Sequence, residues 1–194
     1  MTSIHGLTVH LHTGILVIAL ILTLICILIR LITFMYPRWG LIRDLFTDWS
    51  ITKKIWDHRG IVFKAFDYTT IICVALGLIG LLIGIYTGGE AVNWSFEATE
   101  ILNRAKLILS LYALIFFGLA LLVRAIPNMW RNPGLIVLYG LTIGIGFLFI
   151  FLDGAVGGIW VYHESIAEPM LHWLSDIGFF RLLGLDGLVG ALPI

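Results

Sequence analysis

Four long apolar runs constrain this chain more than any other feature of its sequence. Each run has about 20 residues, which at a rise of about 1.5 Å per residue matches the roughly 30 Å hydrocarbon core of a bilayer. The runs cover residues 13–34, 68–87, 106–126 and 133–153. Because 60% of the 194 residues are hydrophobic and only 12% are charged, a soluble domain is excluded. We expect an all-α integral membrane protein, a four-transmembrane-helix bundle that forms a single membrane domain over residues 1–194.

The basic residues are divided unequally between the two sides of this predicted bundle. Nine lie on the side that holds the connections 35–67 and 127–132, seven in these connections and Arg30 and Arg124 at the adjoining ends of runs, whereas the other side has only Arg104, Lys106 and Arg181. The positive-inside rule places the nine in the cytoplasm and both termini outside. The first run has no basic n-region and no small-residue cleavage site, so we interpret it as a retained helix. The sequence therefore predicts a multi-pass protein of the cell (plasma) membrane, in contact with the lipid bilayer.

Two segments outside the runs are predicted to form interfacial helices. The cytoplasmic loop 35–67 mixes Trp39, Trp49 and Trp56 with basic residues, a composition that suits the lipid headgroup region or a docking surface for a partner subunit. The outer C-terminal segment 164–194 is amphipathic, and its charges and glycines rule out a fifth span. We expect both segments to lie along the membrane surface.

Small residues recur along the second run at helical spacing. Cys73, Gly77, Gly80, Gly84 and Gly88 share one face, which allows another surface to approach closely. That surface is either a neighbouring helix, the commoner case, or a flat cofactor such as a porphyrin. The two cysteines, Cys26 and Cys73, both fall within runs and are predicted to be free thiols.

Five of the six histidines are predicted to lie on the outer side, which suggests a haem b site. His12 stands on the inward face of the first helix, whereas His10 points away from it if the backbone is helical. His163 is the candidate second iron ligand, provided that the chain folds back near Gly157 and Gly158. In this hypothesis Gly84 and Gly88 make room for the ring, while Arg104 and Lys106 hold the propionates. Asp153, the sole acid within or beside a predicted span core, is a further candidate functional residue.

Two other functions remain open at this point. The chain fits a cofactor-free structural or accessory subunit of a larger membrane complex, with its histidines as interfacial polar groups. It also fits a metal or proton site built from His10, His12, His163, Glu164 and Glu90, or a site for a quinone. Sequence motifs for soluble catalysis are absent, so we expect at most an electron-transfer subunit of a membrane oxidoreductase. We expect no nucleic-acid partner.

The end of the fourth run carries a resemblance to a known family. Residues 152–164 read Leu-Asp-Gly-Ala-Val-Gly-Gly-Ile-Trp-Val-Tyr-His-Glu. This segment resembles the ending of a widespread family of small four-helix bacterial and archaeal membrane proteins, whose first helix begins with a histidine-bearing segment similar to residues 10–12. The second helix of that family ends near a Thr-Gly, as residues 87–88 do, and the third closes with an arginine, as Arg124 does. The family looks haem- or redox-associated, but Asn103 or Lys106 stands where its third-helix histidine is expected.

Overall fold

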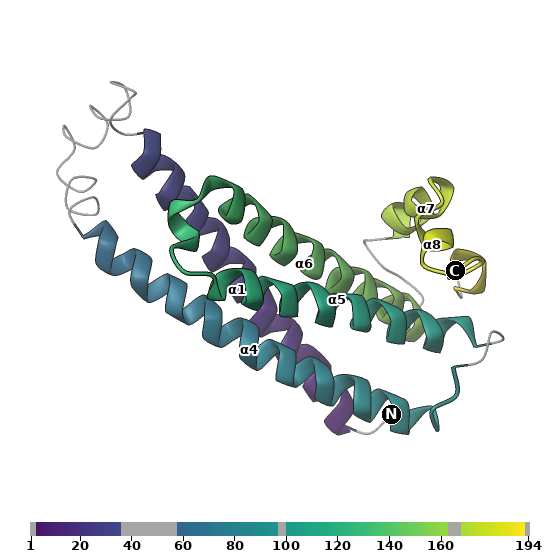
Figure 1. Cartoon of the computed structure of the whole chain (residues 1–194). Helices are drawn as coiled ribbons and strands as arrows, with labels where there is room; N and C mark the ends of the chain where they lie inside the picture. The colour runs from purple at the N-terminus through teal and green to yellow at the C-terminus, as the bar shows by residue number, and fades with distance from the viewer. Residues whose placement is uncertain (1–2, 36–57, 97–99, 163–167, 193–194) are drawn as a thin grey trace.

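The computed structural model describes residues 3–35, 58–96, 100–162 and 168–192, and the side chains of these residues except 3–10, 35 and 160–162. This described part is helical and contains no strand (Figure 1). Its elements, in chain order, are α1 (Ser3–Met35), α4 (Arg59–Ala91), α5 (Ile101–Ala125), η1 (Met129–Arg131), α6 (Pro133–Tyr162), α7 (Glu168–Asp176), α8 (Phe179–Leu182) and η2 (Val189–Ala191). The predicted all-helical class is confirmed.

Four of these helices are long and apolar enough to cross a membrane. The qualifying segments are Leu11–Phe34, Arg59–Ala91, Ile101–Ala125 and Pro133–Ile159. Each predicted run lies mainly within one of them, but the second helix begins at Arg59 rather than at Tyr68. The last nine residues of the predicted loop 35–67 are therefore helical, and the interfacial helices predicted for its other part fall at 36–57, outside the described residues.

The four long helices form two tightly packed pairs, α1 with α4 and α5 with α6, which lie against each other (Figure 1). Glycines explain the closeness of the first pair. A Cβ atom added at Gly77 would collide with the Leu16 side chain, and one added at Gly80 would lie 2.6 Å from Cβ of His12. The glycine stripe of α4 therefore receives side chains of α1, and on this stretch it serves helix packing.

The outward faces of the four long helices are apolar. Leu24 of α1 is 56% exposed, Ile72 of α4 is 58% exposed and Leu122 of α5 is 67% exposed. Buried positions such as Ala19, Ala113 and Ala120 instead lie where helices meet. An apolar exterior around an interior of small residues is the arrangement typical of helices packed in lipid. Both cysteines are free thiols, as predicted.

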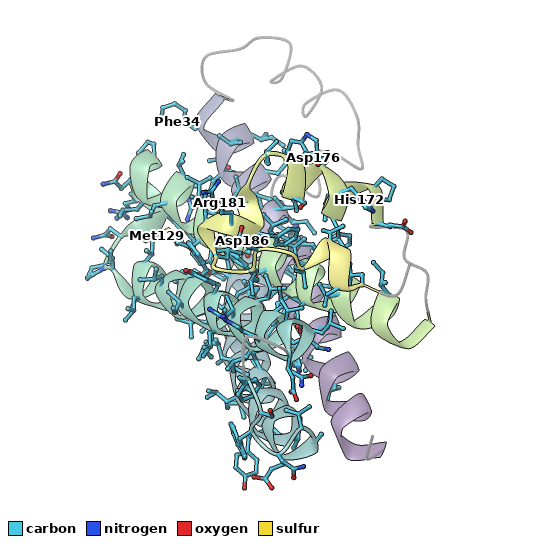
Figure 2. All side chains as sticks on the ribbon, turned by 90° about the vertical axis from the view of Figure 1, so that its right-hand side faces the viewer. Phe34, Met129, His172, Asp176, Arg181 and Asp186 are labelled. Atoms are coloured by element: carbon cyan, nitrogen blue, oxygen red, sulfur yellow. The ribbon has the colours of Figure 1, made fainter. Side chains whose placement is uncertain are left out.

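The C-terminal helices α7 and α8 fold back beside the second pair. The Phe179 ring of α8 lies 6.2 Å from the Phe149 ring of α6, which stacks in turn on Tyr112 of α5 at 5.0 Å. The polar residues labelled on this segment in Figure 2 include His172 and Asp186, both exposed. The segment is thus a folded appendage of the bundle, and its placement along the outer membrane surface stays a prediction.

Candidate functional site

All four long helices contribute to one pocket, called here the polar pocket, at the end of the bundle where α4 ends and α5 begins. Its lining is apolar along α4, where it includes Leu81 and Ile85. The polar side chains come from the other helices and are His12, Asn103, Lys106, Ser110 and Asp153. An apolar hollow with a few convergent polar groups is the usual form of a small-molecule site.

His12 enters the pocket from α1 and is only 3% exposed. It sits on the buried face of α1 together with Leu16 and Ala19, which follow it at helical spacing. A Cβ atom at Gly84 would lie 3.1 Å from Cε1 of its imidazole. Because Gly84 has no side chain, the His12 imidazole has room to pack against α4 here.

Asp153 enters from α6 and is 7% exposed. Within the described part of the chain, its Oδ1 atom has no hydrogen-bond partner. The Ser110 hydroxyl of α5 lies within hydrogen-bond reach of the same carboxyl group. A buried carboxyl with an unsatisfied oxygen is costly, because a protein interior solvates it poorly. Such a group is a candidate binding residue.

The Lys106 side chain extends from α5 to α6 and lies near Asp153. A Cβ atom at Gly157 would lie only 2.9 Å from Nζ of Lys106, so the ammonium group rests on the glycine backbone of α6. Gly157 is one helical turn beyond Asp153, and Lys106 is one turn before Ser110. The pocket therefore holds a cation and a carboxyl group close together.

The pocket is small and half open. Its cavity has a volume of about 70 Å³. Residues at and beyond the end of α4, among them Val92 and Phe96, also line it. A cavity of about 150 Å³ holds a benzene ring, so this one takes a polar substituent or a few waters, and a larger ligand extends into its opening.

Five of the predicted site residues meet in this pocket: His12, Gly84, Gly88, Lys106 and Asp153. Arg104 does not line it, because a two-residue step turns a helix by about 200°. Its guanidinium lies beside Gly184 of the C-terminal segment instead, where a Cβ atom would be 3.6 Å away. His163 and the side chain of His10 fall outside the described residues.

A porphyrin between α1 and α4 does not fit with the described side chains. The space over Gly77, Gly80 and Gly84 is filled by Leu16 and His12, and the neighbouring cavity is smaller than a benzene site. The haem assignment itself stays a prediction, because the second ligand proposed for it, His163, lies outside the described residues.

A metal site that used both His10 and His12 as ligands would need an extended backbone between them, where residues two apart share a face. These residues belong instead to α1, and residues two apart on a helix face different directions. Among the residues that the structure describes, no group of three or more His, Cys, Asp or Glu side chains could hold a metal ion.

A second polar cluster, missed by the sequence analysis, lies at the opposite end of the bundle. Arg124 of α5 donates from Nε to Asp67 Oδ1 of α4 at 2.7 Å and from Nη2 to Oδ2, and Trp130 of η1 donates to Oδ1 at 3.1 Å. The expectation that Asp153 is the sole acid beside a span core is therefore wrong. Asp67 continues the buried α4 stripe of Thr70 and Val74, which is the signal that could have revealed it.

Comparisons with known proteins give no relative for this fold or for either cluster. No family model matches the chain, and no characterised protein or solved structure matches it significantly. The resemblance carried by residues 152–164 therefore stays a prediction.

Proposed function

We propose that this chain is a membrane-embedded electron-transfer subunit that binds the head group of a quinone in the polar pocket. One observation carries the proposal. His12, Lys106 and Asp153, from three different helices, converge in a half-open and otherwise apolar hollow at one end of four membrane-length helices. Ionisable groups placed there are rare in membrane proteins and mark functional sites by default.

The chemistry of the pocket matches a quinone better than a charged metabolite. A quinone has two carbonyl oxygens that only accept hydrogen bonds, and Lys106 and Asn103 offer donors to them. Asp153, with its unsatisfied oxygen, is placed to accept a hydrogen bond from a hydroxyl of the reduced form or to exchange a proton with it. The pocket combines donors and an acceptor, as a ligand that alternates between carbonyl and hydroxyl requires.

The shape supports a ligand that enters from one side. The cavity of about 70 Å³ suits one carbonyl with its ring edge, so the rest of an apolar ring lies in the mouth of the pocket. A quinone dissolved in the bilayer reaches such a mouth through the lipid phase. The predicted orientation puts this mouth on the outer side of the membrane.

A second candidate function is a cofactor-free accessory subunit of a larger membrane complex. It is favoured by the use of Gly77 and Gly80 for packing against α1, which leaves these glycines no separate ligand role. In that case the polar pocket holds only water, and the chain acts through surfaces that other subunits cover.

The experiment is quinone titration of the purified protein in mild detergent. Short-chain ubiquinone and menaquinone analogues are titrated by calorimetry into the unchanged protein and into the variants Lys106→Met and His12→Ala. We expect binding of at least one analogue, weakened about tenfold in Lys106→Met, because one direct hydrogen bond is worth about that factor, and also weakened in His12→Ala, which removes an imidazole that lines the pocket. His172→Ala, which alters an exposed histidine outside the pocket, should bind normally. Absence of binding to the unchanged protein overturns the proposal and leaves the accessory role.

A further inference from the structure

The end of the bundle opposite the polar pocket concentrates positive charge. Three arginines lie there: Arg30 near the end of α1, Arg124 in the last turn of α5 and Arg131 in η1. The carboxylate of Asp67 lies close to Arg30 and Arg124. This basic end is separate from the proposed quinone site, and the proposed function does not use it.

Asp67 neutralises only one of the three arginines by direct contact. Its two oxygens are held by the Nε and Nη2 groups of Arg124, and Oδ1 also accepts from Trp130. No contact of this kind joins Asp67 to Arg30, although the two lie close enough to attract each other. The charge of Arg30 therefore remains without a bonded counter-ion among the described residues.

The guanidinium of Arg30 is held in a defined orientation. It lies 4.1 Å above the Phe63 ring centroid, and Phe63 is itself fixed edge-to-face against Trp130 at 5.0 Å. Stacking of this kind covers the face of the guanidinium and leaves its N–H donors directed sideways. The buried Nε of Arg30 has no hydrogen-bond partner in the described part of the chain. An oriented fork of donors with an unsatisfied N–H is what an oxyanion requires.

We propose that Arg30 binds a phosphate group in bidentate fashion, with the charge of Arg131 in support. A planar guanidinium matches the oxygen spacing of phosphate and forms two parallel charge-assisted hydrogen bonds with it. Arg131 lies close enough to Arg30 to repel it, and an anion between them relieves that repulsion. Arg30 also lies four residues before Phe34, the end of the apolar span, which is the level of lipid headgroups. The phosphate is that of an anionic phospholipid or free inorganic phosphate.

The test measures thermal unfolding of the full chain in two kinds of vesicle, one of phosphatidylcholine alone and one of an equimolar mixture with phosphatidylglycerol. A second measurement, native mass spectrometry, counts the phosphatidylglycerol molecules that the protein retains. The unchanged protein should unfold at a higher temperature in the mixture and retain the anionic lipid. Arg30→Gln should lower retention about tenfold or more, the factor expected for the loss of a charge-assisted hydrogen bond. A third arm adds inorganic phosphate to phosphatidylcholine vesicles, and stabilisation there that Arg30→Gln abolishes supports the site with free phosphate as its ligand.

Two further variants separate a defined site from diffuse attraction. Lys64→Gln removes an exposed positive charge at the same end of α4 and should leave retention nearly unchanged. Arg30→Lys keeps the charge and the fold but loses the bidentate fork, so it should lose most of the retention. Three results would overturn the proposal. The first is an equal loss of lipid retention in Lys64→Gln and Arg30→Gln, and the second is full retention in Arg30→Lys. The third is an unchanged protein that neither the anionic lipid nor phosphate stabilises.

Discussion

The Asp67–Arg124 ion pair joins the two helix pairs, so it offers a quantitative test of the architecture. In Asp67→Asn the side chain keeps its shape and one acceptor oxygen, but it loses its charge and one oxygen that accepts from Arg124. The Asp67 side chain is 7% exposed and that of Arg124 is 21% exposed, so water replaces the lost interaction poorly. A charge-assisted hydrogen bond is worth about 1.5–3 kcal/mol, and breaking a fully buried pair costs about 3–5 kcal/mol.

Because Arg124 retains some access to water, we expect Asp67→Asn to lower the free energy of unfolding by about 2–3 kcal/mol. The assay is SDS-induced unfolding in mixed micelles, followed by circular dichroism. The double variant Asp67→Asn/Arg124→Gln should be less destabilised than the sum of the single variants, since it leaves no unpaired charge. As a control, His172→Gln breaks an exposed pair with Glu168, whose atoms lie 4.0 Å apart, and should cost less than about 0.5 kcal/mol. A loss below about 0.5 kcal/mol in Asp67→Asn would refute the reasoning, because the pair would then contribute no more than a surface contact.

Two further predictions concern glycines, with Gly158→Ala as the common control because a Cβ atom there meets open space. Gly80→Ala places a methyl group 2.6 Å from Cβ of His12, so it should force α1 from α4 and cost about 1–3 kcal/mol in the same unfolding assay. A cost no larger than that of the control would mean that the helices are not in close contact. Gly157→Ala displaces the ammonium of Lys106 and should weaken quinone-analogue binding severalfold while the unfolding midpoint stays unchanged. Equal quinone-analogue affinity in Gly157→Ala and Gly158→Ala would show that the contact of the Lys106 ammonium with α6 does not contribute to binding.

Most of the polar pocket could be predicted from helical periodicity and depth. The stripes on the predicted helices placed His12, Gly84 and Gly88 on inward faces, and the lengths of the runs placed them level with Lys106 and Asp153. Both arguments depend only on the rise and pitch of a helix, which hold for any long apolar segment. The structure brings all five residues into the same pocket.

Arg104 lies outside the pocket although it shares a depth with Lys106. A shared depth does not fix a shared face, because a two-residue step places the two side chains on different faces of α5. The side chain of Lys106 enters the pocket, whereas Arg104 meets the C-terminal segment. That contact could not be foreseen, because the position of the segment depends on long-range aromatic packing around Phe149.

The cluster at the basic end escaped prediction for another reason. A charged residue near the end of an apolar run lowers the local hydropathy, so hydropathy alone predicts a second span that begins after Asp67. The acid is tolerated inside α4 because Arg124, 57 positions further along the chain, neutralises it. A pairing over that distance is fixed by how the helices pack, which the sequence of a single helix does not contain.

The central claim is that a quinone occupies the polar pocket, and photolabelling tests it most directly. An azido-quinone is irradiated with the purified protein, and labelled peptides are located by mass spectrometry. We predict label within residues 84–96 and 103–110, two segments that contain most of the pocket lining, and loss of this label when excess unlabelled quinone is present. Label spread over the exposed apolar faces around Leu24 and Leu122, undiminished by the competitor, would contradict it.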